Sequence, residues 1–145
     1  MAIQTLLNYN RSANNIANSA STPFVGTPLL LAEFGLFVPQ ATNFVELIAT
    51  VGWSSVPSAL EPNQSEVEFF INQDNIRVVS TREEAPTDGS DPPLFVTTTF
   101  QGVLTNVSTG HHVYQLFAQN LQDTQSSTTI VGPVTISGKV IGPES

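Results

Sequence analysis

Apolar and polar residues alternate along FVELIATVGW (44–53) with the period of two that a β-strand imposes on its two faces. The residues that this pattern assigns to the core are Val45, Leu47, Ala49, Val51 and Trp53. Glu46 and Thr50 fall on the opposite face. We therefore expect a half-buried strand here, with Trp53 in the core.

A second alternating run, EVEFFINQ, begins at Glu66. Its predicted core-facing residues are Val67, Phe69 and Ile71. Asp74 and Asn75 follow, and both residue types tolerate the left-handed conformations of a tight turn. Strand-forming residues then return, so residues 66–81 are predicted to form a β-hairpin.

In the rest of the chain after residue 24, runs of strand-forming residues also alternate with turn-forming segments, as in a β protein. Further strands are predicted at 30–38, 94–104, 111–121 and 128–142, and loops at 54–65 and 83–93. Pro133 cannot donate to a β-ladder, so the last strand should contain a bend, a bulge or an edge. About seven to nine strands joined by short turns predict an all-β fold, an antiparallel β-sandwich of the jelly-roll type over residues 24–145.

Residues 1–23 differ from the rest in being dense in Asn, Ser and Ala. Their apolar residues, Ile3, Leu6, Leu7 and Ile16, form only a ragged helical stripe. We expect an N-terminal extension that either stays flexible or becomes ordered against a partner.

Three apolar residues fall on the outward face of the predicted strands, namely Phe70, Val79 and Phe117. Outward apolar residues on several strands indicate a second covered surface, and subunit contact is the simplest way to cover it. The candidate assembly residues are therefore Ile3, Leu6, Leu7, Ile16, Phe70, Val79 and Phe117.

The amino-acid composition of the chain excludes several classes of function. The 145 residues suit one domain, and they carry 4 Lys+Arg against 12 Asp+Glu, a formal charge of −8. This balance argues against nucleic-acid binding, which normally requires a basic patch. The absence of cysteine excludes disulfides, thiolate metal sites and cysteine nucleophiles. Because only 11% of the residues are charged, Asn, Gln, Ser and Thr must supply most of the surface polarity.

No membrane association is expected either. The longest apolar run, Leu29–Val38, is interrupted by Glu33 and is shorter than the roughly 20 residues of a spanning helix. The N-terminus MAIQTLLNYNRS lacks the features of a secretory signal. We expect a protein of a spore surface or another extracellular particle, reached without a signal peptide.

Candidate metal ligands are few, and no cofactor is predicted. Adjacent residues on a strand point to opposite faces, so His111 and His112 should not chelate one ion within a monomer. The stretch from Asp88 to Asp91 is similar to a fragment of a calcium loop, but it lacks the remaining ligands.

One pair of carboxylates suggests a hydrolase. Glu66 and Glu68 share a strand face about 7 Å apart, a separation that suits paired-carboxylate hydrolysis. Arg77 on the neighbouring strand could instead pair with them as part of an ordinary exposed sheet face.

The segment FQGVLTNVSTGHHVYQLFAQNL, continued by TTIVGPVTISGKVI, resembles the C-terminal strands of jelly-roll domains of the tumour-necrosis-factor and C1q type. The resemblance is especially to the bacterial versions on spore-surface (exosporium) proteins. The likeness rests on GHHVYQLFA (110–118) and a final strand around 132–138, and residues 45–83 are like the middle strands. It implies a trimer with an adhesive or structural role, although the chain has no collagen-like Gly-X-Y tract.

We therefore expect a non-enzymatic structural protein that assembles with itself, as a trimer or a larger polymer or fibre, and contacts other surface-layer proteins. A binding module, such as a phage receptor-binding tip or a carbohydrate-binding sandwich, is the alternative. It would use loops 54–65 and 83–93, helped by Trp53 or Tyr114.

Overall fold

Nine strands and no helix make up the part of the chain that the computed structural model describes, residues 4–16, 20–57, 65–85, 94–124 and 126–143. The strands are β1 (Gln4–Asn14), β2 (Thr22–Phe24), β3 (Leu29–Val38), β4 (Phe44–Pro57), β5 (Ser65–Gln73), β6 (Ile76–Ala85), β7 (Leu94–Leu104), β8 (Gly110–Asn120) and β9 (Ser126–Pro143). The all-β prediction is confirmed.

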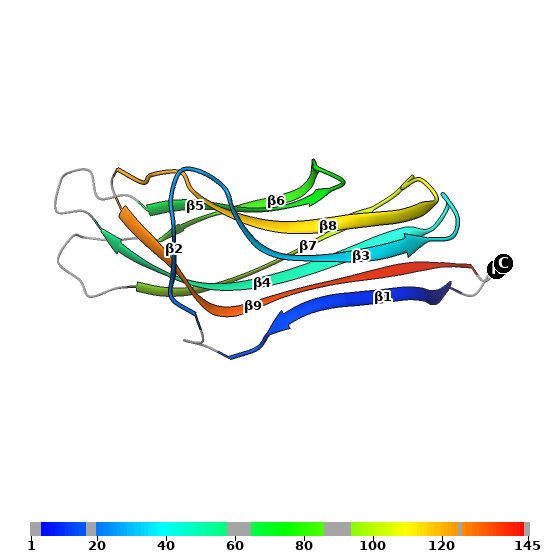
Figure 1. The fold of residues 1–145 in the computed structure, drawn as a ribbon, viewed down its shortest axis with the longest axis horizontal. Coiled ribbons are helices and arrows are strands. Elements are labelled where there is room, and N and C mark those ends of the chain that lie inside the picture. The colour runs from blue at the N-terminus through cyan, green and yellow to red at the C-terminus, as the bar shows by residue number, and fades with distance from the viewer. Residues whose placement is uncertain (1–3, 17–19, 58–64, 86–93, 125, 144–145) are drawn as a thin grey trace.

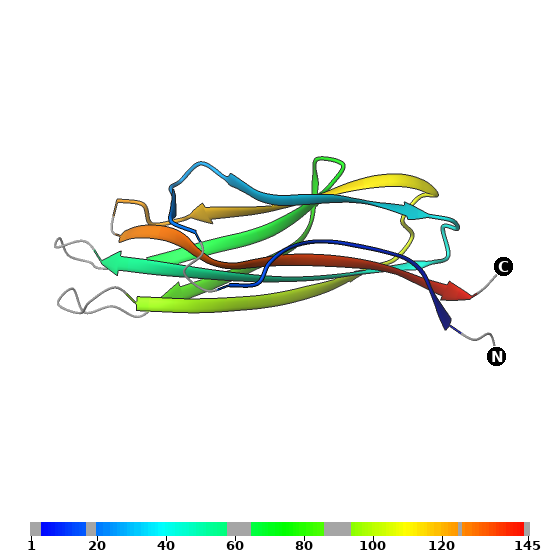
Figure 2. The ribbon, with the colours of Figure 1, turned by 60° about the horizontal axis from the view of Figure 1, so that its bottom comes forward.

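The strands form two antiparallel sheets that pack face to face (Figure 1). The first sheet has the order β1-β9-β4-β7, with β2 also paired to β9, and the second has the order β3-β8-β5-β6. From β3 onward the chain passes between the sheets at every connection except the β5–β6 hairpin. Figure 2 shows the two layers of this elongated β-sandwich from a second side. The predicted sandwich is therefore confirmed.

The core lies between the sheets and follows the alternation in the sequence. All five core positions predicted on β4, from Val45 to Trp53, are fully buried. The Trp53 ring packs against Phe69 of the second sheet, with 6.1 Å between the ring centroids. Leu36 and Leu116 are buried opposite them. A strand whose alternate residues are apolar thus buries one face, as expected.

The predicted hairpin is also confirmed. β5 and β6 pair along their length, and Asp74 and Asn75 connect them with φ angles of 49° and 72°. Two consecutive residues with positive φ form the tight turn whose twist matches that of the flanking strands.

The irregularity expected at Pro133 lies in the pairing of β9 with β4. Their register shifts between Val51 and Trp53. Gly52 lies at this break, where a Cβ atom would be only 2.0 Å from the Gly132 carbonyl oxygen. The absence of a side chain at Gly52 is what allows the two backbones to approach so closely.

The N-terminal segment differs from its prediction. Residues Gln4–Asn14 do not extend from the sandwich but form β1, which pairs antiparallel with β9 from Gln4↔Pro143 to Asn14↔Val134. The proposed domain boundary at residue 24 is therefore wrong for this stretch. Backbone hydrogen bonding, which has no hydrophobic signature, places these residues at the edge of the first sheet (Figure 1).

Candidate functional site

The candidate assembly residues of the N-terminal segment have different environments. Leu6 and Ile16 are exposed, by 55% and 70%. Leu7 instead packs against the core, so it is not available to a partner. Ile3 lies outside the described residues.

Phe70 and Phe117 do face outward on the second sheet, but they cover one another. They are direct neighbours on β5 and β8, and their rings stack with centroids 5.1 Å apart. The Arg77 guanidinium lies 3.7 Å above the Phe70 ring centroid, a cation–π contact. As a result Phe70 is only 4% exposed. This pair is thus largely covered within the chain.

Val79 faces the core rather than solvent, which corrects the prediction. It is paired with Ile71, and residues directly opposite each other share a face of the sheet. The next pair is Asn72↔Arg77, so Val78 is an extra residue on β6. This bulge shifts the alternation by one position and turns Val79 inward.

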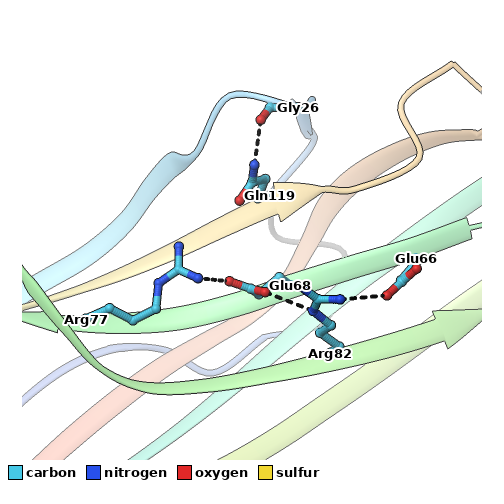
Figure 3. A network of polar contacts seen from close by, with 6 residues as sticks. All are labelled: Gly26, Glu66, Glu68, Arg77, Arg82 and Gln119. Carbon is cyan, nitrogen blue, oxygen red and sulfur yellow. Dashed lines mark hydrogen bonds and ion pairs between the residues drawn. The ribbon is translucent and has the colours of Figure 1, made fainter.

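The two carboxylates considered for hydrolysis belong to an ion-pair network (Figure 3). Glu68 accepts hydrogen bonds from Arg77 and from Arg82 Nε, the latter at 3.1 Å. Glu66 lies 3.5 Å from Arg82 Nη1. The Glu68 side chain is 6% exposed, and both of its oxygens are occupied by arginine. The network ties β5 to β6 and leaves Glu68 inaccessible to a substrate.

A second polar cluster joins β8 to the β5–β6 turn. His112 Nδ1–H donates to Asp74 Oδ2 at 2.5 Å, and Nε2–H donates to the Ser108 carbonyl oxygen at 2.7 Å. The other Asp74 oxygen accepts the Val113 backbone N–H at 2.9 Å. His112 is buried and His111 exposed, so the two histidines lie on opposite faces, as predicted.

The cluster favours the charged forms of both partners. Burial lowers the pKa of His112, but the hydrogen bonds to Asp74 and to Ser108, with the Asp74 charge, outweigh burial and raise it above 6.5. Burial likewise raises the pKa of Asp74. The Val113 N–H and His112 more than offset this, with a smaller contribution from the charge of His111, and hold it below 3.8.

Ser108, His112 and Asp74 are connected in the order of a catalytic triad, with 3.4 Å between Ser108 Oγ and His112 Nε2. A triad histidine must accept the serine proton at this nitrogen. Here Nε2 is directed at the closer carbonyl oxygen of Ser108 and acts as a donor. The geometry therefore suits a structural clamp rather than activation of Ser108.

The aromatic residues suggested for ligand contact are both in the core. Trp53 and Tyr114 are fully buried. Trp53 Nε1 donates to Thr98 Oγ1, and Tyr114 donates to Gln73, so their polar atoms are also satisfied. Neither ring can stack on a sugar. Of the two loops, residues 58–64 and 86–93, which include Asp88 and Asp91, lie outside the described residues.

Sequence reasoning missed the outer face of the first sheet. Exposed apolar side chains lie on it at Leu6, Tyr9, Phe44, Phe95 and Val103. The strand register aligns Leu6, Ile141 and Phe44 in one row across the sheet. The next row contains Tyr9, Lys139, Glu46 and Val103. We call this surface, from β1 through β9 and β4 to β7, the β1–β7 face.

The outer face of the second sheet is different in kind. Leu30, Phe37 and Val113 are exposed there, but only on β3 and β8. The other half of that face, on β5 and β6, holds the glutamate–arginine network. The β1–β7 face is thus the surface on which exposed apolar side chains extend from one edge strand to the other.

Comparison of the chain with family models and with curated proteins finds no match in either set. Within the described residues, no helix has the length and apolarity needed to cross a bilayer. The same residues contain no group of three or more His, Asp or Glu side chains placed to hold a metal ion.

Proposed function

We propose that this protein is a structural subunit that assembles with further copies of itself through the β1–β7 face. The observation that carries the proposal is the set of exposed apolar side chains on β1, β4 and β7, on one face of the first sheet. Tyr9 is 46% exposed, Phe44 42% and Val103 56%. Exposed apolar side chains gathered on one face mark interaction sites on soluble proteins.

The size of the face suits a subunit interface. Four strands about 4.8 Å apart, each contributing about ten residues at 3.3 Å per residue, present about 600 Å². Standard interfaces bury about 800 Å² on each partner. The side chains that project from the sheet add to the flat area, so the face is large enough for a stable contact.

Charge also favours this face. Two copies with a formal charge of −8 each repel one another. The β1–β7 face carries Arg11 and Lys139 against Glu46, and these include two of the four basic residues of the chain. Contact through this face therefore brings together little of the negative charge that makes two copies repel one another.

The strand order supports a finer description of the fold. Two four-stranded antiparallel sheets joined by repeated crossings are the arrangement of a jelly roll, and β2 is the one strand added to it. We assign the sandwich to this class, of the tumour-necrosis-factor and C1q type. The assembly is then a trimer or a larger polymer on the surface of a spore or another particle.

The native mass of the full chain, measured by light scattering after size exclusion, tests the proposal. We expect a multiple of 15.5 kDa. Val103→Glu adds a charge to the β1–β7 face and should shift the mass toward the monomer. Val113→Glu is the matched control, because Val113 is 41% exposed on the other sheet, and it should leave the mass unchanged. A monomeric wild-type chain, or dissociation by Val113→Glu alone, would contradict the proposal.

A further inference from the structure

Strand β1 is attached to the sandwich mainly through its backbone. It pairs with β9 over ten residues, yet none of its 11 side chains is buried. A central strand such as β8 instead buries every second side chain, from His112 to Asn120. Leu7 is the hydrophobic residue of β1 that packs against the core.

β1 also packs against β3 of the second sheet. The Asn10 side-chain amide donates to the Gly35 carbonyl oxygen of β3 at 3.0 Å. Farther along, a pocket of about 260 Å³ separates the end of β1, at Ser12 and Asn14, from Leu30 and Ala32 of β3. The last residues of β1 therefore gain little from packing between the sheets.

A copy of β1 from a second chain would make the same contacts. The ladder to β9, the packing of Leu7 and the hydrogen bond of Asn10 depend on the sequence of β1, not on the chain that supplies it. Without β1, the stretch Val134–Pro143 of β9 would present an unpaired edge, which readily accepts another strand. Exchange of an identical element between copies costs little for this reason.

The connection to the rest of the chain permits the exchange. β1 ends at Asn14, and β2 begins at Thr22 on the same edge of β9. Ala20 also donates its backbone N–H to the Val131 carbonyl oxygen of β9, so the connection between the two attachments is residues 15–19, which span at most about 18 Å when extended. Phe24, at the end of β2, is 2% exposed in the core and anchors the chain at this point. β1 can thus leave while β2 remains in place.

We infer that β1 is exchanged between copies of this chain, so that the β9 edge of one subunit is completed by the β1 of a neighbour. This inference rests on the assembly proposed above and says how neighbouring subunits are linked. The β1–β7 face supplies the contact surface, and exchange of β1 makes the first sheet of each subunit a composite of two chains.

Engineered disulfides test the exchange in a chain that has no cysteine of its own. Ala13 and Thr135 are direct partners on β1 and β9, and Cα atoms of antiparallel partners lie within disulfide range. The full-length assembled protein carrying Ala13→Cys and Thr135→Cys is oxidised and run on a denaturing gel without reductant. Exchange predicts bands at multiples of the chain mass, and pairing within one chain predicts a single monomer band.

A matched pair controls for random cross-linking. Ile48 and Gln101 are direct partners on β4 and β7, strands that are not exchanged. The protein carrying Ile48→Cys and Gln101→Cys should give only the monomer band. If the double β1–β9 variant does not fold, co-expression of an Ala13→Cys chain with a Thr135→Cys chain gives the same information. A linked pair of chains then supports exchange, and its absence from assembled protein overturns it.

The outcomes separate this inference from the proposed function. Multimers linked through β1 and β9 support both. An assembled protein with links only inside each chain overturns the exchange and leaves the assembly standing. The same holds if the control pair links and the β1–β9 pair does not. A wild-type chain that is monomeric by light scattering overturns the assembly, and the exchange with it.

Discussion

His112 and Asp74 lie 2.5 Å apart across the gap between β8 and the β5–β6 turn, although 38 positions separate them in the sequence. The second nitrogen of His112 is bonded to the Ser108 carbonyl oxygen. Since both nitrogens donate, the doubly protonated ring is the form that satisfies the site. Protonation of His112 therefore strengthens the hydrogen bonds that hold β8, the β5–β6 turn and the segment at Ser108 together.

The stability of the protein should depend on pH through this clamp. His112 has a pKa raised above 6.5 by folding, so its contribution is complete below pH 6.5 and is lost as the pH rises through the folded value. Asp74 has a pKa lowered below 3.8, so its contribution is present above pH 3.8 and is lost as the pH falls through the folded value. We expect the free energy of unfolding in urea to be greatest between these limits.

The variant His112→Gln should remove the alkaline part of this dependence. We expect it to destabilise the protein by about 1 kcal/mol at pH 5.5 and by less at a pH above the raised pKa of the ring, where the wild-type ring has lost its charge. His111→Gln is the control, because His111 is exposed and should leave the profile nearly unchanged. Equal losses for His112→Gln at both pH values would show that the charge of the ring does not contribute.

Thr98 should matter far more than its neighbour Thr99. Thr98 Oγ1 accepts from Trp53 Nε1 at 3.0 Å and donates to Glu83 Oε2 at 3.0 Å, which joins the two sheets through a buried hydroxyl. Thr98→Val leaves the buried indole N–H without its partner, so we expect a loss of about 1–3 kcal/mol in urea unfolding.

Thr99→Val is the control for that experiment. The Thr99 hydroxyl bonds to Thr50 on the exposed face at 2.9 Å, where water can replace it. We expect a change within about 0.5 kcal/mol. Similar losses for the two variants would mean that the contact between the sheets adds nothing beyond the β-ladder.

Glu68→Gln should destabilise the protein. The buried carboxylate pairs with Arg77 and Arg82, and its replacement leaves two guanidinium groups without their common partner. Both arginines are largely exposed, so the loss is limited to about 1–2 kcal/mol in urea unfolding. Glu66→Gln, at the looser pair, should cost no more than about 0.5 kcal/mol. Equal losses of stability for Glu68→Gln and Glu66→Gln would contradict the conclusion that Glu68 is the centre of the ion-pair network.

Gly52→Ala should weaken the junction of β4 and β9. The added Cβ would lie 2.0 Å from the Gly132 carbonyl oxygen, and backbone cannot move aside as a flexible side chain can. We expect a loss of about 1–3 kcal/mol in thermal or urea unfolding. Val56→Thr, at an exposed position farther along the same strand, should change stability by no more than about 0.5 kcal/mol. A Gly52→Ala protein as stable as the wild type would show that this junction adjusts freely.

The parts of the fold that could be predicted are those in which burial leaves a periodic pattern. On β4, alternate residues from Val45 to Trp53 are apolar because one face of the strand packs against the second sheet. The Asp74-Asn75 turn was predictable for a similar local reason, since few residue types accept positive φ.

The parts that could not be predicted depend on relations between distant segments. The bulge at Val78 reverses the facing of Val79, and two adjacent valines give no sign of it. β1 is held by backbone hydrogen bonds, which leave no apolar pattern among Asn and Ser residues. The clamp at His112 and the β1–β7 face each need residues from segments that only the sheet order brings together.

The pairing of β1 with β9 has a consequence during synthesis. Gln4 emerges from the ribosome long before its partner Pro143, at roughly 5–20 residues per second, so β1 waits on the order of ten seconds for its ladder. Throughout that interval β1 is an unpaired strand beside other nascent chains on the same messenger. Crowded polysomes should therefore yield more linked subunits than dilute refolding of the same chain.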